Sequence, residues 1–396
     1  MNFMEGLLYI FNPENDLALA YGEEGYTAPP AARQLRRDLQ MLPVWFCEAG
    51  STVLSQCCEE DAVWLGGISD SFGIDTRCIA INHLQNHTYG YRPWGWSRDL
   101  RRRLLNECVP AGQLPMVEQI DRWRELSHRR ISRRLLRWVC ERVAAPMPEL
   151  PHEAHSVAEV REYEHLHRRC YIKAPWSSSG HGVYRVLEPE SRNFAIWTQG
   201  VINRQGSIMC EPALEAVQDF AMEYFCRGGE ALTVGYSVFG NDAHSAFSSG
   251  IVADEATLRG MIVEKLGDGQ LLDAVREAVR QFVESEIAPC YEGYLGVDMM
   301  VYATEKGEIR LNPCIELNLR ATMGVVTAIF ASRYLAPGVR GRFVVEQCGA
   351  CHAGEPAVIA DGRLRGGTLL LTPGYADSRY RARITVEGCG TIAKKT

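Results

Sequence analysis

The sequence IELNLR, which ends at Arg320, has the most restrictive pattern in this chain. Polar and apolar residues alternate in it, and alternate side chains of a β-strand lie on one face of the sheet. Glu316, Asn318 and Arg320 therefore share one face, and Leu317 and Leu319 share the other. Such polar groups are rarely buried without partners. The pattern predicts a buried strand with a polar site on one face; the alternative is a surface hairpin with ordinary ion pairs.

A second strand is predicted at Leu295–Tyr302, separated from the first by the turn sequence ATEKGE. A hairpin through this turn would place Asp298 beside Glu316. Two carboxylates and the amide oxygen of Asn318 form a hard oxygen site of the kind that Mg²⁺ prefers. Arg320 would lie next to the metal and bind a phosphoryl group or a carboxylate.

The segment Tyr171–Val186 reads YIKAPWSSSGHGVYRV, two strand-like pieces around a polar loop. The loop is longer than a tight hairpin turn and lacks the Asn-Gly or Asp-Gly that such turns prefer. Its hydroxyls and backbone N–H groups suit phosphate oxygens, and Lys173 enters from the strand. The loop has neither the Walker A sequence nor Rossmann spacing. We interpret it as a flap that closes over an anionic ligand.

Strands alternating with helices indicate a parallel α/β lobe that ends near residue 115. The strands expected in this lobe are Gly6–Phe11, Leu42–Phe46, Ala62–Gly66 and Cys78–Ile81.

The arginine-rich segment Arg122–Arg142 has apolar residues at helical spacing. It is either a solvated amphipathic helix or a helix with one or two arginines directed into an anion site. Further helices are expected at His155–Arg168, Phe194–Arg204 and Leu271–Ile287. Glycine-rich, strand-like sequence follows residue 340 and predicts a small β module.

The composition limits the classes of partner. The formal net charge of −7 gives no electrostatic basis for binding nucleic acid or an acidic membrane. The first residues have no basic n-region and no apolar run reaches membrane-spanning length, so we expect neither a signal peptide nor a membrane span; the 14 cysteines are scattered, as in reduced proteins. We expect a cytoplasmic protein with small-molecule partners, and a homodimer as the commonest oligomer.

The segments IKAPWSSSGHGV, CEPAL, GVDMMVY and IELNLR, in this order, resemble elements of the ATP-grasp superfamily. They cover about Ile172–Arg320. The loop is most similar to that of the ATP-dependent glycinamide ribonucleotide transformylase, and IELNLR is similar to its counterpart in biotin carboxylase. The resemblance implies an α/β protein with the ATP-grasp fold. Its parts would be a pre-ATP-grasp domain (1–115), an ATP-grasp domain (116–335, with lobes at about 116–205 and 206–335) and a C-terminal β-rich module (336–396).

The resemblance also implies which residues bind the phosphates of ATP. Lys173 would contact the α- and β-phosphates, and Arg130 matches the first phosphate-binding lysine of the family. His181 stands where many relatives have lysine or arginine, so either it protonates beside the phosphates or another cation replaces it. The loop residues that would close over the β- and γ-phosphates are Ser178, Ser179, Gly180, His181 and Gly182.

The remaining roles follow from the same resemblance. Glu211 and the backbone of Leu214 would hold adenine, and Asp219 would bind the ribose. Arg320 would steady an acyl phosphate. The ligands of two Mg²⁺ ions, with Mn²⁺ as an alternative ion, would be Asp298, Glu316 and Asn318.

The expected activity is Mg²⁺-dependent ligation of a carboxylate to an amine, with ATP converted to ADP and phosphate. Relatives form an acyl phosphate that the amine attacks, and charge neutralisation and alignment of the substrates supply the catalysis. Two alternatives stay open. One is a kinase that forms the acyl phosphate without ligation. The other is a non-catalytic nucleotide sensor, because His181 stands where many relatives have a lysine or arginine.

The sequence FNPENDLALA follows the first strand. Ligands of open α/β sheets gather beyond the carboxyl ends of the strands. The candidates for binding the non-nucleotide substrate are therefore Asn12, Glu14, Asn15 and Asp16. The alternative is that these residues form a helix N-cap.

Two further motifs have simpler interpretations. CGACH (Cys348–His352) matches the c-type haem attachment pattern, but haem attachment requires export, and a zinc site with Cys389 lacks a second cysteine pair at finger spacing. We interpret these cysteines as reduced thiols in a loop. Trp94 and Trp96 would either line an acceptor pocket or belong to the core, and we favour the core.

Overall fold

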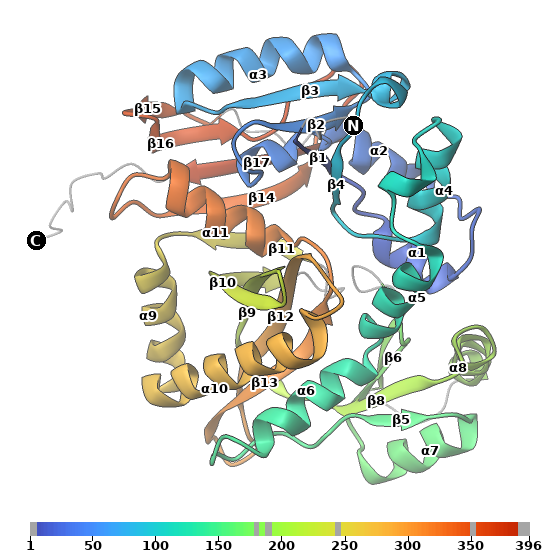
Figure 1. Cartoon of the computed structure of the whole chain (residues 1–396). Coiled ribbons are helices and arrows are strands. Elements are labelled where there is room, and N and C mark those ends of the chain that lie inside the picture. Colours follow the sequence, from blue (N-terminus) through green and yellow to red (C-terminus); the bar gives the residue numbers. More distant parts are fainter. Residues whose placement is uncertain (1–5, 178–181, 187–191, 242–246, 349–353, 387–396) are drawn as a thin grey trace, which may run out of the picture.

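The computed structural model describes residues 6–177, 182–186, 192–241, 247–348 and 354–386, and Figure 1 gives the whole chain. A parallel sheet with the strand order β3-β2-β1-β4 forms the N-terminal layer. This confirms the predicted parallel α/β lobe. The elements of the layer are β1 (Leu7–Ile10), α1 (Asn15–Tyr21), α2 (Pro30–Asp38), the 3₁₀ helix η1 (Leu42–Trp45), β2 (Ser51–Ser55), α3 (Cys58–Phe72), β3 (Thr76–Ala80), η2 (Ile81–Asn86), β4 (Gly90–Pro93), α4 (Arg98–Asn106) and η3 (Ala111–Gln113).

Two strands predicted in this layer are wrong. Ala62–Gly66 lies inside helix α3, whose first turn carries three acidic residues that stabilise a helix N-terminus. Leu42–Phe46 is mostly the 3₁₀ helix η1, where Pro43 has no backbone N–H to donate to a sheet. The sheet takes its other two strands from β2 and β4, neither of which was among the predicted strands.

A four-stranded antiparallel sheet with the order β5-β8-β6-β7 forms a small separate layer beside α7 and α8. The predicted strand–loop–strand corresponds to β6 and β7, with Lys173 opposite Val183. The elements of this region are α5 (Val117–Leu126), α6 (Arg130–Cys140), β5 (His152–Ala154), α7 (Val157–Leu166), β6 (Cys170–Lys173), β7 (Val183–Val186), α8 (Arg192–Gln205) and β8 (Ile208–Pro212).

The arginine-rich segment is two helices and not one. Helix α5 ends at Leu126 and α6 begins at Arg130. Between them, the Arg129 N–H donates to the Pro175 carbonyl (3.2 Å), and the His128 ring accepts the Arg130 N–H (2.9 Å). These contacts replace bonds of a continuous helix, so the break directs Arg129 toward the loop that follows β6.

A nine-stranded sheet with the order β13-β12-β9-β10-β11-β14-β17-β16-β15 forms the centre of the molecule. Helices α9 and α10 pack on its β9–β13 part, and α6 contacts β13 (Figure 1). Its elements are β9 (Glu215–Arg227), β10 (Glu230–Asn241), β11 (Phe247–Val252), α9 (Glu255–Leu266), α10 (Gly269–Phe282), the π-helix η4 (Val283–Ile287), β12 (Gly293–Ala303), β13 (Ile309–Asn318), α11 (Met323–Tyr334), β14 (Gly341–Gln347), β15 (Val358–Ala360), β16 (Arg363–Leu370) and β17 (Tyr380–Val386).

The C-terminal strands continue this sheet, because β14 pairs with β11 and then with β17. They share one core with the N-terminal layer through α11: Trp45, Phe330 and Phe343 are fully buried in the same cluster. The Trp45 indole also donates to the Leu371 carbonyl at 2.7 Å. The proposed division of the chain at residues 115 and 335 stays a prediction.

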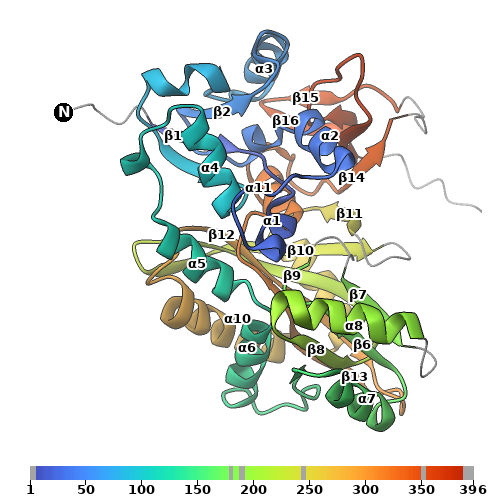
Figure 2. The same cartoon turned by 90° about the vertical axis from the view of Figure 1, so that its right-hand side faces the viewer.

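The N-terminal layer and the small β5–β8 layer lie at opposite ends of the molecule (Figure 2). Helix α1 projects from the N-terminal layer toward the end of β13, where Asp16 contacts Arg320. None of the helices in the described ranges has the length and apolar composition needed to cross a bilayer.

Candidate functional site

Strands β12 and β13 bring the predicted metal ligands together. They pair with Asp298 opposite Glu316 and Asn318 opposite Gly296. The Asn318 amide donates a 3.0 Å hydrogen bond to the Asp298 carboxylate, so these side chains lie on the same face. Leu317 is buried on the other face. The alternation predicted from IELNLR is therefore present.

The carboxylates near this face are close enough to repel one another. Burial and the charge of Glu316 raise the pKa of Asp298 to about 7. Burial and the charge of Asp298 raise the pKa of Glu223, on the neighbouring strand β9, to about 8. The Glu223 carboxylate accepts 2.9 Å hydrogen bonds from the hydroxyls of Ser237 and Thr322. A cation bound at this face would lower both pKa values.

The donor set fits Mg²⁺, which takes oxygen ligands and few of them from the protein. Asp298, Glu316 and Asn318 supply two carboxylates and one amide oxygen. Across the described ranges, no group of three or more His, Cys, Asp or Glu residues is arranged to hold a metal ion. A metal at this face would therefore need further oxygens from a second ligand, such as a phosphate.

Arg320 connects this face with the N-terminal layer. Its Nε and Nη2 atoms both lie 2.8 Å from Asp16 Oδ2. Nη2 also donates to Asn318 Oδ1 (3.2 Å), and Nη1 donates to the Ala321 carbonyl (3.1 Å). Burial raises the pKa of Asp16, and the charge of Arg320 opposes this rise. One guanidinium thus joins the predicted metal ligands to a predicted substrate residue.

Arg129 is a candidate that the sequence analysis missed. It is 8% exposed, and its Nη2 atom lies 2.9 Å from Glu316 Oε1 and 3.0 Å from Ser177 Oγ. Its Nε atom donates to the Ala174 carbonyl at 3.1 Å. The first residues of the loop after β6 and the acidic strand β13 therefore meet at one guanidinium.

Arg130, which was predicted to bind phosphate, begins α6 and has different partners from Arg129. Its Nη2 atom lies 2.8 Å from the Glu153 carboxylate and 3.1 Å from the His128 ring. Its role in binding ATP stays a prediction. The repeated arginines of this segment gave no basis for choosing between Arg129 and Arg130.

Lys173 and Glu211 form an ion pair between β6 and β8, and both side chains are largely buried. They were predicted to bind the phosphates and the adenine of one ATP molecule, and they lie side by side. Leu214 lies between β8 and β9 and is half-buried. Asp219 lies on β9 opposite Met300, and its charge contributes to the raised pKa of Asp298.

Four predicted loop residues lie outside the described residues: Ser178, Ser179, Gly180 and His181. Gly182 closes the described end of the loop, where its carbonyl accepts the Ala174 N–H at 2.7 Å. Its φ of +82° favours glycine, and a Cβ there would lie 2.8 Å from the Ser177 Cβ. The loop therefore requires glycine at this position.

Three of the predicted substrate residues are buried and hold neighbouring segments. Asn12 donates to the Gly95 carbonyl at 2.8 Å. Glu14 is the residue before α1, makes no side-chain cap, and pairs with arginines of α2 and α4. Asn15 packs so closely on Gly95 that a Cβ added to Gly95 would lie 2.3 Å from the side-chain amide of Asn15. Their binding of substrate stays a prediction.

Asp16 differs from these three residues because it lines a groove beside the acidic strand. We call this the Glu316 groove; its wall includes Asp16, Ser127, Trp176, Ser177, Glu316 and Asn318.

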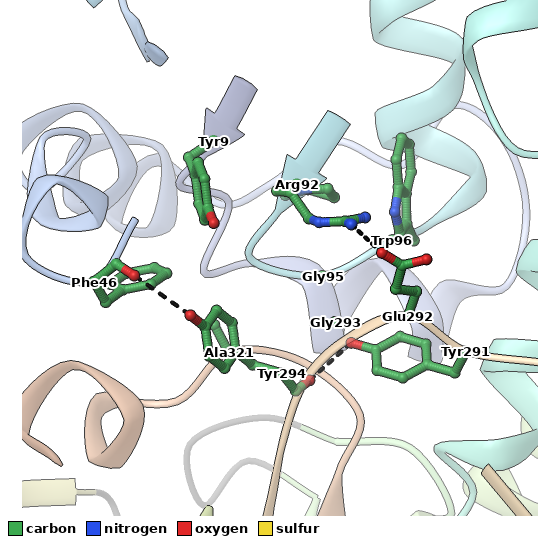
Figure 3. Close-up of a pocket in the computed structure, with 11 residues that line it drawn as sticks. Tyr9, Phe46, Arg92, Gly95, Trp96, Tyr291, Glu292, Gly293, Tyr294 and Ala321 are labelled. Carbon is green, nitrogen blue, oxygen red and sulfur yellow. Dashed lines mark hydrogen bonds and ion pairs between the residues drawn. The ribbon is translucent and has the colours of Figure 1, made fainter. Parts of the chain in front are cut away.

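A second pocket lies under the N-terminal sheet (Figure 3). An ion pair between Arg92 and Glu292 lies at its edge. Trp96 lines this pocket and is half-buried, whereas Trp94 is 4% exposed and belongs to the core. Trp96 also packs against the core cluster around Leu8 and Ile10, so it has a place in the core and in the pocket wall, whereas Trp94 is core only. The pocket side chains are mainly aromatic and include Tyr9, Phe46, Trp96, Tyr291 and Tyr294.

The CGACH motif is only partly described. Cys348 is exposed and its thiol is free, and residues 349–353 lie outside the described ranges. The interpretation of this motif as reduced thiols stays a prediction.

Comparison with solved structures identifies the fold. A biotin carboxylase from Campylobacter jejuni, in complex with beta-gamma-ATP, matches with a TM-score of 0.53 and 12% identity, over 97% of this chain and 87% of that one. The biotin carboxylase domain of the Hydrogenobacter thermophilus 2-oxoglutarate carboxylase matches with a TM-score of 0.51 and 12% identity, over 98% and 87%. No protein-family model and no curated protein matches the sequence. The architecture is that of ATP-grasp enzymes, as predicted.

Proposed function

We propose that this chain, which has the ATP-grasp fold, is a ligase that uses ATP and Mg²⁺ to join a carboxylate to an amine. The observation that carries the proposal is the contact of Arg129 with both Ser177 and Glu316. An anion bound beside Ser177 and Arg129 would lie next to the carboxylates that fit Mg²⁺. The beta-gamma-ATP of one similar structure and the MgADP of the other support this choice of ligand.

The phosphates of ATP would be bound by cationic side chains and by the loop. Lys173 ends β6 just before the loop, Arg129 contacts Ser177 at the start of the loop, and both side chains are buried. Mg²⁺ bound by Asp298, Glu316 and Asn318 would neutralise phosphate charge. The residues proposed for adenine and ribose are Glu211, Leu214 and Asp219, and those proposed for the β- and γ-phosphates are Ser178, Ser179, Gly180, His181 and Gly182.

The proposed reaction has two steps. A carboxylate oxygen of the substrate attacks the γ-phosphorus, and the bond from that phosphorus to the bridging oxygen breaks, so ADP leaves. The amine nitrogen then attacks the acyl carbon, phosphate leaves, and the nitrogen gives its proton to water. Arg320 would stabilise the negative charge of the acyl phosphate with its guanidinium.

The proposal is tested by incubating the purified chain with ATP, Mg²⁺ and pairs of small carboxylates and amines. A ligase releases ADP and forms a product whose mass equals that of both substrates less one water. ADP release without such a product would indicate the acyl-phosphate-forming kinase. Binding of a non-hydrolysable ATP analogue without any ADP release would indicate a sensor. The variant Asp298→Asn is the control, because it removes a proposed metal ligand with little change in volume.

A homodimer is a further part of the proposal. The Hydrogenobacter thermophilus domain is described as a dimer, which supports this assembly. Light scattering on the purified chain measures its mass in solution and separates a dimer from a monomer.

A further inference from the structure

The ion pair between Asp16 and Arg320 lies at the Glu316 groove, because Arg320 contacts Asp16 and Asn318, which both line it. The Asp16 and Arg320 side chains are 16% and 19% exposed, so a ligand can reach them. Asp16 comes from α1 and Arg320 follows β13, so two different elements supply the two charges.

We propose that this pair is the binding site for an α-amino acid, whose carboxylate binds Arg320 and whose ammonium binds Asp16. The inference rests on the proposed function, because it identifies the carboxylate substrate of the ligase. A zwitterion that enters between the two side chains gives each of them a new partner of opposite charge. A carboxylate without an amine would instead leave Asp16 unpaired, and leaving one partner of a buried pair unpaired is costly.

The surroundings of Arg320 allow this exchange. Asn318 Oδ1 and the Ala321 carbonyl hold its guanidinium independently of Asp16. On the other side, the backbone before Asp16 is fixed by a 3.1 Å bond from the Asn15 N–H to the Asn12 carbonyl. Both charged groups would therefore stay in place when the amino acid separates them.

Other contacts also hold the N-terminal layer to the rest of the chain. A second ion pair, between Arg92 and Glu292, spans the same boundary. The Ala321 N–H also donates to the Trp94 carbonyl at 2.8 Å. These contacts would stay in place when a ligand separates Asp16 from Arg320.

The rest of the groove indicates the side chain of the amino acid. Beyond Asp16 and the residues assigned to the metal, its wall includes Leu19, Pro175 and Trp176 and the hydroxyl-bearing Ser127 and Ser177. None of these groups is charged, so they favour an uncharged side chain, because a second buried charge would find no partner of opposite sign among them. With the α-ammonium held by Asp16, a separate amine would attack the acyl phosphate. The product would then keep a free α-amine.

The experiment is isothermal titration of the full chain with each proteinogenic L-amino acid. Each amino acid that binds is compared with the acid that lacks its amine and the amine that lacks its carboxylate. We expect at least one uncharged amino acid to bind, and both truncated forms to bind at least about tenfold more weakly. This comparison uses the unmodified protein and needs no variant to fold.

The variants Asp16→Asn and Glu292→Gln form a matched pair, since each removes one carboxylate from an ion pair across the same boundary. We expect Asp16→Asn to weaken amino-acid binding about 10- to 100-fold and to leave binding of the amine-free acid unchanged. Glu292→Gln should change the binding of neither the amino acid nor the amine-free acid. Equal weakening of both ligands by Asp16→Asn would overturn the inference and leave Asp16 as a structural clasp.

The two proposals fail in different ways. If an ATP analogue binds and no amino acid does, the inference is wrong and the proposed function stands. If amino acids bind in an Asp16-dependent manner and no nucleotide binds, the site is supported and the proposed ATP-dependent reaction is wrong.

Discussion

Replacing Glu223 by Gln should stabilise the metal-free protein at high pH. Glu223 is 1% exposed and lies on β9, between the strands that carry Ser237 and Asp298. The amide of Gln has the shape of a protonated carboxyl group, and the hydroxyls of Ser237 and Thr322 can turn to pair with it. The change therefore removes a buried ionisable group without creating a cavity.

The magnitude follows from the raised pKa of Glu223, about 8 compared with an ordinary 4.5. Below pH 4.5 both the folded and the unfolded chain hold the proton, so Glu223 does not lower the free energy of unfolding there. Between the two values only the folded chain holds it, and the free energy of unfolding falls by about 1.4 kcal/mol per pH unit. The loss is complete above about pH 8 and amounts to roughly 5 kcal/mol.

Urea unfolding in the presence of a chelator, at about pH 5 and about pH 9, measures this loss. We expect wild type and Glu223→Gln to be similar at the lower pH, and the variant to be more stable by several kcal/mol at the higher pH. Asp298 titrates in the same direction, so the variant keeps part of the pH dependence. Glu230→Gln, on the exposed end of β10, is the control and should follow wild type. If the free energy of unfolding fell by the same amount between the two pH values in wild type and in Glu223→Gln, the reasoning would be refuted.

Three further predictions concern activity, nucleotide binding and stability. Glu316→Gln should lower ADP release about 100-fold or more in a coupled assay, because it removes a charge from the proposed metal site; an unchanged rate would exclude this role. Arg129→Met should weaken binding of a non-hydrolysable ATP analogue about tenfold in a titration, since a phosphate contact would be lost. The same change at Arg130 is the comparison, and the arginine whose loss weakens binding is the one at the phosphates. Asp61→Asn should lower the free energy of unfolding by about 1–3 kcal/mol in urea, because one carboxylate oxygen accepts from the Tyr375 hydroxyl and the other from Gln40 Nε2 (2.9 Å), and the amide of Asn has only one oxygen to accept both; no change would mean that these contacts are not stabilising.

The metal face was predictable because it depends on a local rule. Alternation along a strand determines which side chains share a face, whatever the strand packs against. The short turn between β12 and β13 then sets Asp298 opposite Glu316. Both steps use residues close in sequence, so the segments IELNLR and LGVDMMVY were sufficient to predict that Asp298, Glu316 and Asn318 share a face.

Arg129 was not predictable for the opposite reason. The apolar residues from Leu126 to Val139 keep helical spacing across the break between α5 and α6, so periodicity alone indicates one helix. The break is made by the Pro175 carbonyl and the His128 ring, and the first of these is far away in sequence. The continuation of the central sheet into β14 likewise depends on long-range pairing with β11.

The raised pKa values at the acidic face connect the fold with the proposed chemistry. Burial of carboxylates beside one another costs free energy, and Asp298 and Glu223 both have raised pKa values in the metal-free chain. Apolar residues of similar size would avoid this cost. The Mg²⁺ ion that we propose at this face would offset that cost. Arg129 contacts Glu316 and Arg320 contacts Asn318, and the proposed ion would supply the positive charge that lowers the pKa values of Asp298 and Glu223.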